Sequence, residues 1–331
     1  MKKTMCAIMA WAIGLAATAE VVQTGKNITV TGVGTVRVDV AELQVDVRPE
    51  ADVTVEFGKV PVTVYASNAV VNLSNGCSDT WKEDVVLWLD ASKDESFDVY
   101  ESGNGSFKTN GVTVYCPRMQ RWHDWRGGDH NYYAFSSRGL ASCDAMLATD
   151  YDGRHYVSFG NYVEWGRRVE FYKSGEGSEL LTDHKEIPYK FAAIVFGSQL
   201  GGGQSIISSL KRTGSQLTSP TANDPIFGEN FPTWIDGSSV NPRQQSLNGD
   251  WEVISFTGLN GTTLYATGLG LSIWGENERG GQNYREIILL SRVPTETERR
   301  SIERYLAKKW NTTLPSYEGE LRLFGTGNAT V

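Results

Sequence analysis

Residues 284–310 read YREIILLSRVPTETERRSIERYLAKKW and combine two local patterns. The run 287–290 is short, continuous and apolar, which is typical of a strand covered on both faces. Pro294 ends that pattern. Thr295 and Glu298 then form a capping box, in which each side chain accepts a hydrogen bond from the backbone amide of the other residue. The stretch therefore predicts a buried strand followed by a helix that begins at Thr295.

The predicted helix has one apolar stripe. Ile302, Tyr305, Leu306 and Trp310 recur at spacings of three and four residues, as expected for one face of a surface helix. The remaining positions carry charged side chains, namely Arg299, Arg300, Glu303, Arg304 and Lys308. We therefore expect the stripe to pack inward and the charged positions to face solvent.

The same region carries a family-like signature. Its residues are Gly281, Glu286, Arg292, Glu298, Arg299, Tyr305, Leu306, Lys309 and Trp310. This order resembles the C-terminal end of LamG-like, concanavalin A-like domains of secreted bacterial proteins. Residues 87–92 (LWLDAS), followed after an insertion by Trp122, His123 and Asp124, resemble the start of the same domain. Family members place a small-residue turn after Trp-x-Asp, whereas here Trp125 and Arg126 precede the glycines, which indicates an altered loop.

The resemblance covers about residues 81–315 and implies an all-β jelly-roll sandwich of two antiparallel sheets with one C-terminal helix. Short strand patterns between residues 85 and 290 are numerous enough for two packed sheets. Residues 213–248 are rich in Ser, Pro, Gly and Asn and are expected to form a long loop. The composition, with 35 Gly, 10 Trp, 14 Tyr and 12 Phe, fits a β protein rich in turns.

The residues before and after this domain contain a predicted signal peptide and further strand patterns. Residues 1–19 resemble a secretory signal peptide, with Lys2 and Lys3, an apolar core and the cleavage site Ala-Thr-Ala, which predicts a mature chain beginning at Glu20. Residues 20–80 contain short alternating strands, typical of a small sandwich or of β-solenoid rungs. The tail, residues 316–331, has the same alternation. Both flanks are expected to contribute to one accessory sheet or stack.

Net charge and hydropathy limit the kinds of partner that we expect for this chain. The chain has 31 basic and 39 acidic residues, and removal of Lys2 and Lys3 with the leader makes the mature protein still more acidic. Nucleic acid and anionic membranes are therefore unsuitable partners. After the leader no apolar run is long enough to insert into a membrane. We expect a secreted, extracellular or cell-surface protein.

Three cysteines follow the leader: Cys77, Cys116 and Cys143. An odd number in an oxidising compartment allows one disulfide and one thiol, or no disulfide at all. If a pair forms, Cys116 with Cys143 is favoured because both fall inside the jelly-roll region. No CxxC spacing or histidine pairing accompanies them, so they do not indicate a zinc site.

Aromatic and polar residues gather after Trp122. The predicted ligand-binding residues are Trp125, Arg126, Asp129, His130, Tyr132 and Trp234. Flat rings can stack on sugar faces while Asp, Arg and His bind hydroxyl groups. In the structural alternative, Trp122 belongs to the core and Asp124 fixes the turn. Trp234 would contribute a second ring if its long loop folds over the same face.

The sequence offers weak support for catalysis. A glycoside hydrolase needs two carboxylates facing one sugar, and no Glu-x-Asp-x-Glu run occurs. Asp150-Tyr-Asp-Gly153 resembles the beginning of a calcium loop but lacks the later ligands, so a turn is the simpler interpretation. We predict no cofactor, although some relatives carry a structural calcium ion. The predicted function is binding of polysaccharide or glycoprotein glycans, or adhesion to a surface protein, without catalysis. The alternatives are a glycan hydrolase or lyase and a structural surface protein.

Overall fold

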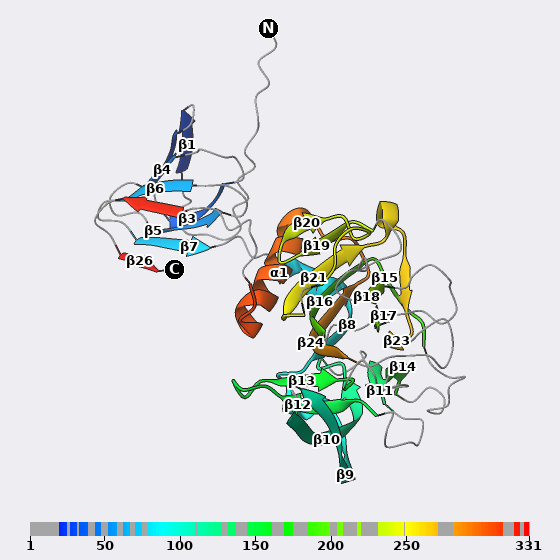
Figure 1. The fold of residues 1–331 in the computed structure, drawn as a ribbon. Helices are drawn as coiled ribbons and strands as arrows, with labels where there is room; N and C mark the ends of the chain where they lie inside the picture. Colours follow the sequence, from blue (N-terminus) through cyan, green and yellow to red (C-terminus); the bar gives the residue numbers. More distant parts are fainter. Residues whose placement is uncertain are drawn as a thin grey trace. The chain divides into compact units, whose positions relative to one another are not determined.

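The computed structural model describes part of the chain. The described residues are 20–24, 27–31, 33–38, 44–47, 52–57, 62–66, 70–74, 79–109, 112–126, 132–136, 144–160, 169–174, 185–198, 204–207, 217–219, 231–247, 249–270, 281–313, 321–324 and 328–330. Contacts divide the chain into two units, one formed by residues 1–79 and 317–331 and the other by residues 80–316. Both are drawn in Figure 1.

The larger unit is built of strands and one α-helix. Its strands are β8 (Val85–Asp90), β9 (Phe97–Thr109), β10 (Val112–His123), β11 (Tyr132–Phe135), β12 (Met146–Thr149), β13 (His155–Ser158), β14 (Val169–Lys173), β15 (Ile187–Tyr189), β16 (Phe191–Ser198), β17 (Gln204–Ile207), β18 (Leu217–Ser219), β19 (Thr233–Ile235), β20 (Ser238–Val240), β21 (Glu252–Thr257), β22 (Leu264–Ala266), β23 (Gly268–Leu269) and β24 (Gln282–Leu290). Three short 3-10 helices, η1 (Asp79–Asp84), η2 (Asp94–Ser96) and η3 (Leu259–Gly261), and the α-helix α1 (Glu296–Trp310) complete it.

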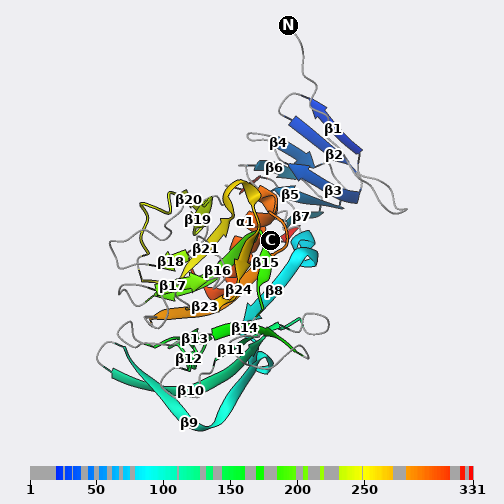
Figure 2. The same cartoon turned by 90° about the vertical axis from the view of Figure 1, so that its right-hand side faces the viewer.

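The strands form two antiparallel layers joined through β10. One layer runs β20-β19-β21-β16-β24, and β24 pairs on its other side with β13 and β8. The second layer runs β9-β10-β11-β14-β23, and β10 also pairs with β12 at Arg118 and Met146. Figure 2 shows β9 and β10 as a long curved hairpin. Residues of both layers and of α1 share one buried core. The prediction of an all-β fold with a C-terminal amphipathic helix is thus confirmed.

The strand and helix of residues 284–310 form as predicted. Residues 287–290 are fully buried within β24. Thr295 caps α1, and both hydrogen bonds of the capping box with Glu298 are present. The helix ends at Asn311, whose φ of 53° is left-handed, a common way to terminate a helix. Ile302, Leu306 and Trp310 are buried in the core.

The charged side of α1 differs from the prediction. Arg299, Glu303 and Arg304 are at most 6% exposed, although the amphipathic pattern placed them in solvent. Arg299 Nη1 lies 2.6 Å from Glu303 Oε1, and the Ser255 hydroxyl donates to the same oxygen. A buried charge is tolerated when it is paired and hydrogen-bonded, so ion pairing allowed this side to be covered as well. Helical periodicity alone cannot reveal such pairing.

The smaller unit is a stack of parallel strands with one antiparallel strand, β1, paired to β2. Its strands are β1 (Glu20–Thr24), β2 (Asn27–Thr31), β3 (Val33–Val38), β4 (Gln44–Val47), β5 (Asp52–Phe57), β6 (Val62–Ala66), β7 (Val70–Ser74), β25 (Leu321–Phe324) and β26 (Asn328–Thr330). β2, β4, β6 and β25 pair in parallel to make one sheet, and β3, β5, β7 and β26 make a second. This is the pairing of stacked solenoid rungs, because rungs repeat in one direction.

The last rung comes from the C-terminal flank. β25 pairs with β6, and β26 pairs with β7, although the larger unit lies between these strands in the sequence. The register aligns Ile28, Val45, Val64 and Leu323 in one column. The larger unit is therefore an insertion between the third and fourth rungs of the stack.

Part of the expected loop at 213–248 is a hairpin. β19 and β20 pair with each other, and β19 extends the large sheet through β21. Asp236 and Gly237 join the two strands with φ values of 45° and 78°. Asp-Gly favours a two-residue hairpin turn with positive φ at both positions, and this was the missed signal.

Candidate functional site

The second layer carries polar and aromatic side chains on the side away from the core. Side chains alternate along a strand, so Trp122, Ala134 and Phe171 enter the core while their neighbours point outward. We call the outward set the outer face. It consists of Asp98, Arg121, His123, Tyr133, Phe135, Glu170 and Tyr172, in the rows Asp98–Arg121–Phe135–Glu170 and His123–Tyr133–Tyr172.

The rings of the outer face form a separate packed cluster. Tyr133 and Tyr172 stack with centroids 6.0 Å apart, and Phe135 meets Tyr172 edge-on at 5.8 Å. The Tyr172 hydroxyl donates to Glu170 at 3.0 Å. Arg121 lies over the Tyr133 ring at 5.5 Å. These three rings are at most 9% exposed, so they support the charged residues beside them rather than offering bare stacking surfaces.

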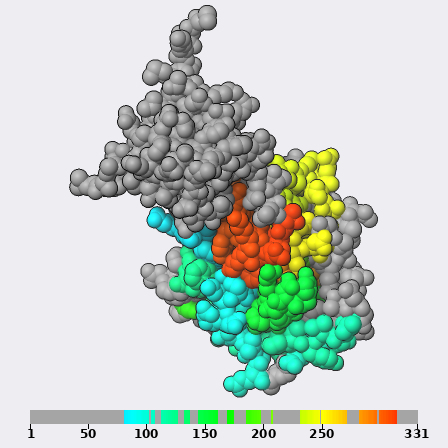
Figure 3. Space-filling view, turned by 90° about the vertical axis from the view of Figure 1, so that its left-hand side faces the viewer, coloured from blue at the N-terminus to red at the C-terminus, as the bar shows by residue number. Residues whose placement is uncertain are grey.

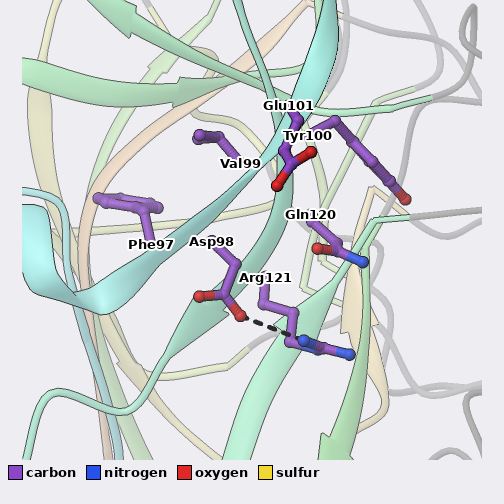
Figure 4. Close-up of a pocket in the computed structure, with 7 residues that line it drawn as sticks. All are labelled: Phe97, Asp98, Val99, Tyr100, Glu101, Gln120 and Arg121. Carbon is purple, nitrogen blue, oxygen red and sulfur yellow. Dashed lines mark hydrogen bonds and ion pairs between the residues drawn. The ribbon is translucent and has the colours of Figure 1, made fainter.

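An open groove of about 730 Å³ borders this face. Its lining residues come from β9 and β10 and are Phe97, Asp98, Val99, Tyr100, Glu101, Gln120 and Arg121. Figure 4 shows Asp98 and Arg121 joined across the two strands. Strand pairing shifts register on both sides of Met119, which marks β-bulges. Bulges re-aim side chains, and here they lie next to the groove.

Asp98 is the best-defined group in the groove. Its Oδ2 lies 3.2 Å from Arg121 Nη1 and 3.0 Å from His123 Nε2. A carboxylate only accepts hydrogen bonds, so His123 carries a proton on Nε2. Burial raises the pKa of Asp98, but the hydrogen bonds from His123 and Arg121 outweigh it, and the pKa lies below its ordinary value. Asp98 is thus an ionised acceptor at neutral pH rather than a proton donor.

The residues around the Trp-x-Asp motif stabilise their loop. Trp122 is fully buried, and Asp124 accepts the Trp88 amide at 3.3 Å. Arg126 donates to both oxygens of Asp124, and its Nη1 reaches the Val85 carbonyl at 2.6 Å. The guanidinium of Arg126, a predicted ligand residue, therefore holds the turn against β8.

The other predicted ligand residues occupy different places. Trp125 is 40% exposed, its ring meets Trp88 edge-on at 5.1 Å, and Lys93 lies over it at 5.4 Å. Tyr132 is half-buried and packs against the main core, on the opposite side of β11 from Tyr133. Asp129 and His130 lie outside the described residues.

Trp234 lies well apart from Trp125. Register places Trp234, Ser255, Ala193, Ile288 and Trp88 in one row across β19, β21, β16, β24 and β8. Four strand spacings of about 4.8 Å separate the ends of this row by roughly 19 Å.

Helix α1 lies between the two tryptophans. Arg299 stacks over Trp234 at 4.3 Å, and Tyr305 meets Trp88 at 5.9 Å. Figure 3 shows the helix in orange-red between residues near 80–100 in cyan and residues near 231–270 in yellow. Trp125 and Trp234 thus flank the helix on opposite sides instead of closing on one ligand.

The Asp150 motif is a turn. Asp150 Oδ1 accepts the backbone amides of Asp152 and Arg154, each at 2.9 Å, and Oδ2 pairs with Arg285. In the part of the chain that the structure describes, no group of three or more His, Cys, Asp or Glu side chains is arranged to hold a metal ion. Within the same residues, no helix has the length and hydropathy needed to cross a membrane.

The predicted cysteine pairing falls partly outside the described residues. Cys116 packs with Met146 and Ala148, whereas Cys77 and Cys143 lie outside, so the cysteine pairing stays a prediction. The groove itself was missed, because the pairing of Asp98 with Arg121 depends on a bulged register that the strand patterns do not encode.

Comparison with protein-family models, with curated proteins and with solved structures found no match.

Proposed function

We propose that this protein is an exported, LamG-like carbohydrate-binding protein without catalytic activity, and that it binds glycans in the groove lined by β9 and β10. The observation that carries the proposal is the Asp98 carboxylate, fixed by Arg121 and His123 at the edge of an open groove. Carboxylate, guanidinium and amide groups on neighbouring strands offer acceptors and donors to sugar hydroxyls. Charge-assisted hydrogen bonds are the stronger ones, so they fix the orientation of a ligand.

The groove suits binding better than hydrolysis. A glycosidase needs one carboxyl group whose pKa is raised so that it can protonate the leaving oxygen. The pKa of Asp98 moves in the other direction. The other polar lining residues are Tyr100, Gln120 and the exposed carboxylate Glu101, which offer further hydrogen-bonding groups to a ligand.

A glycan array with the full chain, followed by titration of the best glycan, tests this function. Loss of a hydrogen bond to a charged group costs about 1.5–3 kcal/mol, so Asp98→Asn and Arg121→Lys should each weaken binding roughly tenfold or more. Asp94→Asn is the matched control, because Asp94 is 80% exposed and does not line the groove. We expect no release of reducing ends from the bound polysaccharide.

Other outcomes would favour other functions. Release of reducing ends would support the hydrolase. Loss of binding in Trp125→Ala, with Asp98→Asn unchanged, would move the site to the exposed tryptophan that the sequence predicts. Failure to bind any glycan would favour the alternative that the chain is a structural surface protein.

A further inference from the structure

A lysine and two carboxylates meet beneath the end of α1. Lys309 Nζ lies 2.5 Å from Asp90 Oδ2 and 2.7 Å from Glu286 Oε2. The Asp90 side chain is 1% exposed and that of Glu286 is fully buried. A carboxyl carbon lies about 1.2 Å from its oxygen, so Nζ is within about 3.7 Å of Asp90 Cγ. This is close to the separation of about 3–3.5 Å from which an amine attacks a carbonyl carbon.

The second oxygen of Asp90 is held as an oxyanion would be. Asp90 Oδ1 accepts from the Ser92 amide at 2.9 Å and from the Ser92 hydroxyl at 2.7 Å. Two donors on one oxygen polarise the carboxyl group and stabilise the negative charge that develops there during attack. Oδ2, beside Lys309, is then the oxygen free to leave.

Aromatic side chains surround Glu286, while the Lys309 side chain is 21% exposed. Glu286 accepts hydrogen bonds from Trp88 Nε1 at 2.7 Å, Trp310 Nε1 at 2.6 Å and the Tyr305 hydroxyl at 2.9 Å. Lys309 Nζ lies 5.2 Å from the Trp310 ring centroid. Exclusion of water strengthens electrostatic interactions and protects a product from hydrolysis. Burial, followed by the charge of Asp90, raises the pKa of Glu286, which suits a group that must take up and return a proton.

We propose that Lys309 and Asp90 become covalently joined by a side-chain amide bond, with Glu286 as the proton carrier. The ammonium group of Lys309 first gives a proton to the Asp90 carboxylate, which leaves an amine and a carboxylic acid. The Nζ lone pair attacks Cγ, and the new C–N bond places negative charge on Oδ1. Glu286 takes the second proton from Nζ and passes it to Oδ2. The C–Oδ2 bond breaks, and Oδ2 leaves as water. No oxidant, reductant or cofactor is required.

The fold supplies the driving force for this condensation. Amide formation from an amine and an acid is unfavourable between separate molecules in water. Reacting groups held in one geometry reach effective concentrations of about 10⁵–10⁸ M, which compensates for that. The two residues are 219 positions apart in the chain, so the bond forms only after β8, β24 and α1 have assembled.

Tryptic peptide mapping of the denatured full chain tests the bond directly. Trypsin does not cut after an acylated lysine, so peptide 83–93 should be recovered joined to peptide 309–322. The branched species should be lighter than the two peptides together by one water. Tandem mass spectrometry should place the junction between Asp90 and Lys309. A cyclised Asp90 also loses one water but remains in a linear peptide, so the branched species separates the two cases.

Three variants complete the test. Lys309→Arg keeps the positive charge but cannot form the amide, so only linear peptides are expected. Lys308→Arg is the matched control, because Lys308 is exposed on the same helical turn, and the branched species should persist. Glu286→Gln keeps the shape of the side chain but cannot take up and return a proton. It should sharply reduce the fraction of the protein recovered as the branched species.

The peptide map of the wild-type chain tests for the Lys309–Asp90 bond even if Glu286→Gln fails to fold. Recovery of wild-type peptides 83–93 and 310–322 as separate linear species, without the branched species, would overturn the proposal. A branched species that persists at full yield in folded Glu286→Gln would remove the role assigned to Glu286.

Discussion

The Trp310 indole Nε1 donates to Glu286 Oε2 at 2.6 Å and so ties the last residue of α1 to strand β24. Glu286 is fully buried, and Lys309 Nζ contacts the same oxygen. The other oxygen accepts from Trp88 and Tyr305. Both oxygens are satisfied, so the loss of one donor leaves a buried charge under-solvated.

Replacement of Trp310 by Phe should therefore lower the free energy of unfolding by about 1–3 kcal/mol, the cost of a buried polar group that loses its partner. Denaturant unfolding is the measurement. Trp125→Phe is the control, since its ring is 40% exposed, and it should change little. Equal effects from the two variants would show that the contact with Glu286 contributes nothing.

Helix α1 should tolerate loss of its cap better than a charge in its stripe. Leu306 is fully buried, so Leu306→Asp places a charge in the core and should prevent folding or lower the melting temperature severely. Thr295→Ala removes one capping interaction and should cost about 1 kcal/mol. Similar melting temperatures for the two variants would mean that the helix is not docked through its apolar stripe.

The stability contributed by Asp98 should be lost only in acid. Burial raises the pKa of Asp98, but the hydrogen bonds from His123 and Arg121 together lower it by more. The folded pKa therefore lies below the unfolded value of about 3.9. The contribution is complete above that value and disappears as pH falls through the folded pKa.

The stability difference between wild type and Asp98→Asn, measured by thermal melts from pH 7 to pH 3, should accordingly be constant at neutral pH and shrink below about pH 4. A difference that shrinks between pH 7 and pH 5 would contradict this charge assignment.

The fourth solenoid rung should protect the third. Deletion of residues 317–331 removes β25 and β26 and should speed amide hydrogen exchange in β6 and β7, which lose their parallel partners. Deletion of residues 325–331 removes only β26 and should affect β7 but spare β6. Exchange in β24 should stay slow in both, because it belongs to the other unit. Unchanged exchange in β6 after the longer deletion would contradict the pairing.

Local signals explain what the sequence predicts well. The capping box, the Pro294 break and the apolar run 287–290 are properties of neighbouring residues, and the structure confirms the strand and the helix. The Asp236–Gly237 turn was equally local and could have been recognised. Burial of Arg299 and Glu303 could not, because it depends on Ser255 and Trp234, which approach from β21 and β19.

The candidate site depends on long-range pairing. Asp98 meets Arg121 and His123 across a bulged register, and the ring cluster joins side chains of β10, β11 and β14. Strand alternation assigns each residue to a face but does not say which strand lies beside which. Trp125 and Trp234 illustrate the same limit, since both are aromatic and near the surface, yet α1 lies between them.

The insertion of the larger unit between two rungs sets the path of mechanical force. A pull along the chain enters this unit near β8 and leaves it near the end of α1. Asp90 and Lys309 lie at those two places and contact one another. Tension would therefore be shared by this contact, the β8–β24 ladder and the Asp84–Arg292 ion pair. As an ion pair the contact would yield with these neighbours under load; as an amide bond it would keep the chain between Asp90 and Lys309 from extending even after they had yielded.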